Sequence, residues 1–218
     1  MSLRARFLIE LGALGAATAV FLAVFPRRPI AVDIVLALVA LALLLSTARF
    51  TWREVWRLGE RTREDLKASI RWIAVFTIPA VALFLLFGAV AAYREKGGPG
   101  ITERILNPNL ALAVLLYLPW ALLQETLFQF YLLGRLKTIF DGRYPFLFCA
   151  LNAVGYSLVH MPEIPVCIAT GLAGVVWSWL YLRYRHLLPI AASHAILGAT
   201  FYYWAIGKDL VAAHLGAP

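Results

Sequence analysis

The sequence predicts an all-α membrane protein, a polytopic bundle of about seven transmembrane helices. Hydrophobic residues make up 62% of the 218 positions and charged residues only 15%, and the mean hydropathy is +0.78. A soluble domain of this size could not cover such a composition with polar surface. In addition, several apolar runs approach the roughly 20 residues that a helix needs to cross a bilayer. The Lys and Arg residues are concentrated on one side of these runs, as in integral membrane proteins.

The candidate spans follow one another along the whole chain. The clearest is the segment 72–93, which is apolar and contains no charged residue. The segment before it, 47–71, mixes charges with Trp52, Val55 and Trp56 and predicts a cytoplasmic amphipathic helix lying on the inner leaflet. We expect one integral membrane domain over 1–218. Its candidate spans are 7–25, 29–48, 72–93, 109–134, 145–160, 164–182 and 187–207.

The distribution of basic residues predicts the orientation and the surroundings of the chain. With the N-terminus inside, most Lys and Arg residues fall in cytoplasmic segments, many of them between Arg49 and Arg71. The net charge of +8 is then explained by topology and by contact with anionic lipid, and no nucleic-acid partner is expected. The sequence therefore predicts a multi-pass protein of the cell membrane.

Three ionisable residues fall inside apolar runs. Glu125 is the only charged residue between Ile105 and Gly134, while His160 ends one run and His194 interrupts another. Ionisable groups inside a membrane are costly and mark pathways or reactive sites. Three kinds of chemistry fit this set. A carboxylate and an imidazole can activate water while a second histidine stabilises an oxyanion. The same groups suit a metal ion, or a proton relay in a transporter.

The order of three sequence blocks resembles a known family. The blocks are "QETLFQFYLLGRL", "YSLVH" and "GLAGVVWSWLYLRYRHLLPIAASHAILG". They resemble the CPBP family of CAAX-protease and bacteriocin-processing intramembrane proteases, which shows EExxxR, FxxxH and HxxxN motifs on separate spans. The resemblance covers the family-like core, about 105–206. It implies a metal-independent glutamate mechanism without a cofactor, acting on a membrane-anchored or peripheral protein substrate. If a metal were bound, Glu125, His160 and His194 would be its ligands.

The family motifs are only partly present. The second glutamate and both histidines fall on Glu125, His160 and His194, which we interpret as the catalytic residues. The other positions differ from the family and are taken as supporting or degenerate. The first glutamate is replaced by Gln124, the arginine by Gln129, the aromatic residue by Tyr156 and the asparagine by Gly198. The resemblance places the family's base at position 124, but Gln124 cannot accept a proton from water. Our hypothesis is therefore that Glu125 serves as the base together with His160.

Two functions remain open from the sequence. The first is an intramembrane endopeptidase, a hydrolase that cuts a peptide bond of a membrane-associated substrate. The alternative is a catalytically inactive member that binds substrates or a protein partner in the membrane. One difficulty concerns depth. If the spans end as predicted, Glu125 and His194 lie about 10–15 Å above the inner loops, whereas His160 lies about 20 Å above them. The three residues can then converge only if the span 145–160 is tilted or starts later than predicted.

Overall fold

The computed structural model describes residues 2–24, 35, 38–39, 42 and 62–215. These residues form helices and short connections and include no strand, which confirms the all-α prediction. Three stretches are long and apolar enough to cross a membrane: 63–96, 98–139 and 164–184. These helices confirm the class of helical membrane bundle. The predicted span 29–48 lies almost wholly outside the described residues, and the total of seven spans stays a prediction.

The chain divides into two compact units that alternate along the sequence. Unit 1 comprises Met1–Arg61 and Leu123–Leu187, and unit 2 comprises Thr62–Leu122 and Leu188–Pro218. One boundary falls within helix α6, so this helix contributes to both units. The organisation of the chain as a single domain stays a prediction.

Unit 1 is built around a helix that changes its pitch. Helix α6 (Asn109–Glu125) passes without a break into the π-helix η2 (Thr126–Leu132) and then into α7 (Leu133–Ile139). The change is visible in the hydrogen bonds, because the N–H of Leu133 donates to Phe128 O, five residues back. The other elements of unit 1 are α1 (Leu3–Val24), α8 (Pro145–Leu158) and α9 (Ile164–Tyr184).

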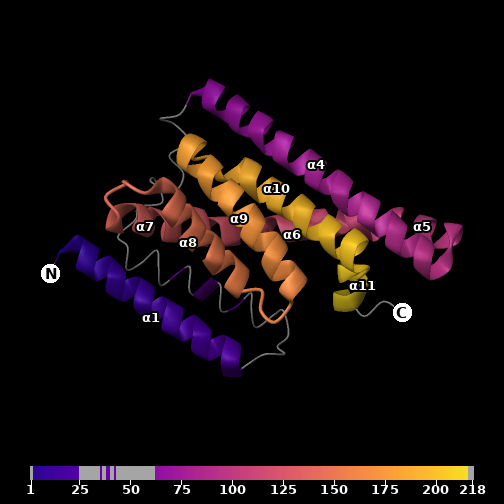
Figure 1. Cartoon of the computed structure of the whole chain (residues 1–218), viewed down its shortest axis with the longest axis horizontal. Helices are drawn as coiled ribbons and strands as arrows, with labels where there is room; N and C mark the ends of the chain where they lie inside the picture. Colours follow the sequence, from indigo (N-terminus) through magenta and orange to yellow (C-terminus); the bar gives the residue numbers. More distant parts are fainter. Residues whose placement is uncertain (1, 25–34, 36–37, 40–41, 43–61, 216–218) are drawn as a thin grey trace. The chain divides into compact units, whose positions relative to one another are not determined.

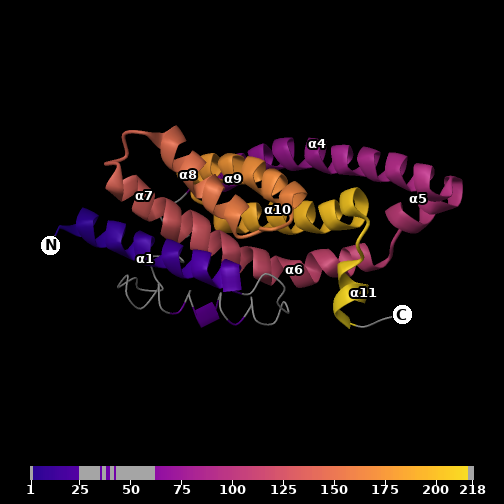
Figure 2. The ribbon, with the colours of Figure 1, turned by 60° about the horizontal axis from the view of Figure 1, so that its bottom comes forward.

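Helices α8 and α9 pack side by side in an antiparallel pair (Figures 1 and 2). Small residues on α9 make this close approach possible. A Cβ atom added at Gly174 would lie 3.1 Å from Ala153 Cα, and one added at Gly171 would lie 3.5 Å from Ser157 Cβ. Interfaces between membrane helices depend on such small residues, because packing replaces the hydrophobic effect as the driving force.

Helix α1 packs along α7 through a buried charge. The Arg135 side chain is only 3% exposed, and its Nε lies 3.7 Å from Glu10 Oε2. The guanidinium also covers the rings of Phe7 and Tyr131, at 4.6 and 4.0 Å from their centroids. Both rings and the carboxylate compensate the desolvated charge. Arg135 therefore holds α1 to α7 within unit 1.

Unit 2 contains the longest helix and the C-terminal elements. Helix α4 (Arg63–Lys96) begins with a capping box, in which the Thr62 hydroxyl accepts from Asp65 N and the Asp65 carboxylate accepts from Thr62 N. Residues 63–71 of the predicted amphipathic segment are thus the first turns of α4, and 47–61 lie outside the described residues. The remaining elements are α5 (Gly98–Ile105), the first part of α6, α10 (Leu187–Thr200), η3 (Phe201–Ile206) and α11 (Leu210–Leu215).

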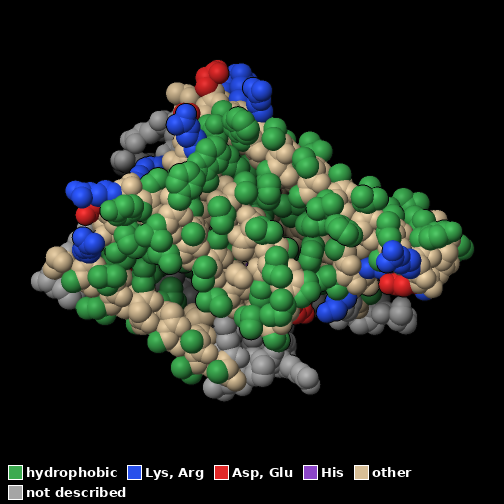
Figure 3. Space-filling model, viewed as in Figure 1, with side chains coloured by type: hydrophobic (Ala, Val, Ile, Leu, Met, Phe, Trp, Pro, Cys, Tyr) green, Lys and Arg blue, Asp and Glu red, His purple; other side chains and the backbone are tan. Residues whose placement is uncertain are grey.

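Helix α4 runs parallel to α10 and η3 (Figure 1). The contacts follow in the same order on both sides: Thr77 with Ser193 at 2.7 Å, the rings of Phe84 and Phe201 at 5.1 Å, and Gly88 against Trp204. Helix α10 is antiparallel to α6, since Ala121 packs with Ala191 and Ala113 with Ala199. In Figure 3 hydrophobic side chains cover the visible face of α4 between charged groups at its two ends, as a spanning helix requires.

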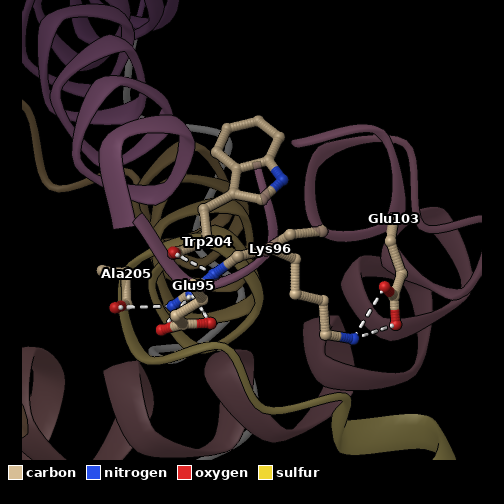
Figure 4. A network of polar contacts seen from close by, with 6 residues as sticks. Glu95, Lys96, Glu103, Trp204 and Ala205 are labelled. Atoms are coloured by element: carbon tan, nitrogen blue, oxygen red, sulfur yellow. Dashed lines mark hydrogen bonds and ion pairs between the residues drawn. The ribbon is translucent and has the colours of Figure 1, made fainter. Parts of the chain in front are cut away.

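Polar contacts connect α5 with the end of η3 and with the C-terminal end of α4 (Figure 4). Arg104 Nε donates to Trp204 O at 2.9 Å and Nη2 donates to Ala205 O at 3.2 Å, while Nη1 lies 3.3 Å from the Glu95 carboxylate. These bonds satisfy carbonyls at the end of η3 that have no partner within the helix. The same figure shows Lys96 Nζ reaching Glu103 at 2.8 Å, in an ion pair that is mostly exposed.

Asp209, in the connection that follows η3, links this connection to the start of α6. Its carboxylate accepts hydrogen bonds from Tyr203 OH, Ala212 N and the side chains of Asn107 and Asn109. Burial alone would raise the pKa of this carboxyl, but the four hydrogen bonds outweigh it and hold the pKa below its usual range. The carboxylate therefore stays ionised and fixes the start of α11.

Candidate active site

Glu125 lies at the junction between α6 and the π-helix η2. Its side chain is 0% exposed, and the adjacent Gln124 is 8% exposed. A π-helix inserted into an α-helix is uncommon and occurs frequently at functional sites, because the wider turn redirects the side chains around it. Gln129, which replaces the arginine of the family motif, lies within η2 and is also fully buried. The motif block therefore coincides with the one change of pitch in this helix.

Helix α8 runs antiparallel to η2 and supplies the next residues. The rings of Phe128 and Tyr156 are stacked with their centroids 4.0 Å apart. Four residues earlier on α8, Asn152 Nδ2 donates to Gln129 Oε1 at 3.3 Å and to Ser178 Oγ at 2.8 Å. The aromatic position of the motif therefore packs directly on the helix that carries Glu125.

His160 follows the end of α8 and is half-buried. Its Nδ1 lies 2.7 Å from Tyr156 O. A carbonyl oxygen can only accept, so Nδ1 carries the proton in this hydrogen bond. In the neutral imidazole the lone pair is then on Nε2, which is the form a general base requires. The hydrogen bond also ties the orientation of the imidazole to the backbone of α8.

Glu125 and His160 lie at nearly the same height in unit 1, measured along their helices from the connection between α7 and α8. This corrects the depth difference expected between them. The helix that carries Glu125 does not end at Gly134 as predicted but continues to Ile139. Fourteen residues separate Glu125 from Ile139, and fifteen separate Pro145 from His160, so both lie about 20 Å from that end. The antiparallel contacts agree with this height, because Asn152 meets Gln129 and Tyr156 meets Phe128. No tilt or late start of α8 is needed.

His194 belongs to unit 2 and lies on α10 with 2% of its surface exposed. The ring of Tyr117, from α6, meets the imidazole edge to face with centroids 5.7 Å apart. Gly198, one turn further along α10, lies under the same tyrosine. A Cβ atom at Gly198 would be 2.6 Å from Tyr117 Cε1 and 3.4 Å from Cζ. The side chain of Tyr117 thus occupies the place that an asparagine at position 198 would fill.

The predicted residues are distributed over both units. Unit 1 contains Gln124, Glu125, Gln129, Tyr156 and His160, and unit 2 contains His194 and Gly198. The convergence of His194 with the other two catalytic candidates stays a prediction. Among the described residues no group of three or more His, Cys, Asp or Glu side chains is arranged to hold a metal ion.

Two polar residues at the site were not predicted from the sequence. Asn152 lies one helical turn before Tyr156 in an otherwise apolar run, and this spacing could have marked it. Tyr117 could not have been found in this way. It lies 77 positions before His194, on another helix, and nothing in the local pattern distinguishes it from an aromatic residue that faces lipid.

The fold and these residues define a helical membrane protein with ionisable side chains buried in its apolar helices. The family model described as type II CAAX prenyl endopeptidase Rce1-like matches residues 106–200. This segment contains all three motif blocks, and the match confirms the resemblance: residues 106–200 form an Rce1-like segment. The match supports a CAAX-type intramembrane protease-like protein in general terms. No curated protein and no solved structure matches the chain.

Proposed function

We propose that this protein is an intramembrane endopeptidase that hydrolyses a peptide bond of a membrane-anchored or peripheral protein. The observation that supports this best is that unit 1 contains a fully buried carboxylate, Glu125, and an imidazole at nearly the same height, His160. Burying a carboxylate among apolar helices costs free energy, and ionisable groups inside a membrane mark sites of chemistry.

In the proposed reaction Glu125 and His160 activate a water molecule. The lone pair of His160 Nε2 accepts a hydrogen bond from the water, and the Glu125 carboxylate takes the proton as the water oxygen attacks the scissile carbonyl carbon. The carbonyl oxygen becomes an oxyanion, to which His194 donates a hydrogen bond. When the tetrahedral intermediate collapses, the C–N bond breaks and the proton passes from Glu125 to the leaving amine. The products are a carboxylic acid and an amine, and transfer of the acid proton to the amine gives a carboxylate and an ammonium group.

Gln124 and Gln129 support this assignment of the base. An amide can hold water or substrate through hydrogen bonds, but it cannot accept a proton. Gln129 Oε1 also accepts from Asn152, and this contact fixes the amide. Glu125 is therefore the one residue of the first motif block that can act as a base. The alternative is an inactive protein that binds the same substrates, and it is favoured by the same two glutamines and by Gly198.

A comparison of protein termini tests the proposal without assuming a substrate. Membranes are prepared from cells that lack the chain and are complemented with the wild type, Glu125→Gln, His160→Ala or the control Glu163→Gln. Glu163 is an exposed carboxylate of the same unit. We expect specific new termini with the wild type and the control only. Identical termini in all four membranes would reject the peptidase and favour the inactive binding protein. The readout covers prenylated and unmodified substrates alike.

A further inference from the structure

We propose that Tyr117 supplies a second hydrogen bond to the oxyanion, beside His194. The inference rests on the proposed function, since it assigns a residue to the same reaction. On α10 the buried His194 is followed one turn later by Gly198, which has no side chain. Residues four apart share one face of a helix, so Tyr117 is the side chain that covers this face at position 198.

The geometry of the tyrosine ring supports this role. The edge-to-face contact places Tyr117 beside the His194 imidazole, at 5.7 Å between centroids. The carbon nearest to Gly198 is Cε1, and Cζ, which bears the hydroxyl, lies 3.4 Å from the Cβ position. The Cδ1–Cε1–Cζ edge of the ring therefore lies over the face of α10 at position 198, with the ring beside the imidazole. A glycine at 198 is required for this contact, because a Cβ at 2.6 Å from a ring carbon would force the ring away.

The chemistry of a phenol suits the assignment. A tyrosine O–H is a hydrogen-bond donor that serves in oxyanion sites, and two preorganised donors stabilise the developing charge better than one. Tyr117 would donate to the oxyanion formed on the substrate carbonyl without transferring its proton. Because it would touch the reacting group, it would be a catalytic residue and not one that merely positions His194.

The test uses the full-length chain in liposomes with a synthetic peptide that spans a wild-type-dependent terminus from the experiment above. Tyr117→Phe removes only the hydroxyl. We expect kcat to fall about 100-fold or more while KM stays within about twofold, since the lost interaction exists only in the transition state. The control is Tyr203→Phe, which removes a hydroxyl bonded to Asp209. It should lower the unfolding temperature and leave kcat of the folded protein unchanged.

A second pair of variants tests the position itself. Gly198→Asn alone should lower the unfolding temperature, because its Cβ would overlap the ring of Tyr117. Tyr117→Leu should be as slow as Tyr117→Phe, and Tyr117→Leu combined with Gly198→Asn should recover at least tenfold in kcat by presenting an amide donor from α10.

The outcomes separate this inference from the function on which it rests. A Tyr117→Phe protein with wild-type kcat would overturn the role of Tyr117 alone, provided that Glu125→Gln is inactive on the same peptide. If the wild type produces no new termini, both proposals are overturned. A fall in kcat with unchanged KM, with recovery in the double variant, would support the assignment.

Discussion

Asn152 donates one hydrogen bond to Gln129 and another to Ser178, at 3.3 and 2.8 Å. It thereby connects three elements of unit 1, namely η2, α8 and α9. All three side chains are 0% exposed. This bridge lies one turn from Tyr156, which packs against Phe128 in the helix that carries Glu125. The polar bridge therefore helps to fix the height at which α8 meets the helix of Glu125.

Replacement of Asn152 by leucine should destabilise unit 1. The change removes both hydrogen bonds and leaves the Ser178 hydroxyl and the Gln129 oxygen without this donor, so we expect a loss of about 1–3 kcal/mol in the free energy of unfolding. Denaturant unfolding in detergent micelles measures it. Val154→Ala is the matched control, because Val154 is 52% exposed on the same helix. Equal stability of the two variants would show that the bridge contributes nothing.

The two glycines of α9 should respond differently to alanine. At Gly174 a Cβ would lie 3.1 Å from Ala153 Cα and 3.3 Å from Tyr156 Cβ, so α8 would have to move. At Gly171 the nearest atom would lie at an ordinary 3.5 Å. Gly171→Ala should therefore be neutral or gain up to about 1 kcal/mol in helix propensity. Gly174→Ala should lose about 1–3 kcal/mol through overpacking.

Unfolding curves and cleavage rates of the two alanine variants check this. Because Tyr156 belongs to the affected contact, Gly174→Ala should also slow peptide cleavage, whereas Gly171→Ala should cleave as the wild type does. Equal rates and stabilities for the two would contradict the close packing of α8 and α9.

An exchange of two neighbouring residues identifies the position of the base. The double variant Gln124→Glu/Glu125→Gln keeps the composition and the charge but moves the carboxylate by about 100° around the helix. If Glu125 is the base, the double variant should be as inactive as Glu125→Gln, with rates at least about 100-fold below the wild type. The time course of new termini in isolated membranes measures this. Restored cleavage in the double variant would place the base at position 124.

Two neighbouring ion pairs of unit 2 should differ in their contribution to stability (Figure 4). The Arg104 side chain is 12% exposed and donates to two backbone carbonyls of η3. Its replacement by glutamine should cost about 1–3 kcal/mol. Lys96 and Glu103 form a pair whose side chains are 61% and 67% exposed, so Lys96→Gln should change stability by less than about 1 kcal/mol.

Thermal unfolding followed by tryptophan fluorescence distinguishes the two variants, since Trp204 lies next to the Arg104 contact. Arg104→Gln should unfold at a lower temperature, and Lys96→Gln should follow the wild type. The reverse order would show that the exposed pair holds this end of unit 2.

Much of the fold was predictable because the length of an apolar run is a local property. The all-α class follows from composition, and the run 72–93 lies within α4 (Arg63–Lys96). The end of the fourth predicted span was wrong by five residues, because the helix continues past Gly134 through Arg135 to Ile139. The structure compensates the charge of Arg135 with Glu10 and two aromatic rings.

The sequence by itself determined the class of protein, the family-like segment and the identity of the ionisable residues, because these depend on composition and on the order of motifs. Only the tertiary structure decided that Glu125 and His160 share one height, that Asn152 bridges three helical segments and that Tyr117 covers Gly198. These relations join residues from different helices. They are set by the pitch of η2 and by the distance at which small residues allow helices to pack, and no local pattern along one helix encodes them.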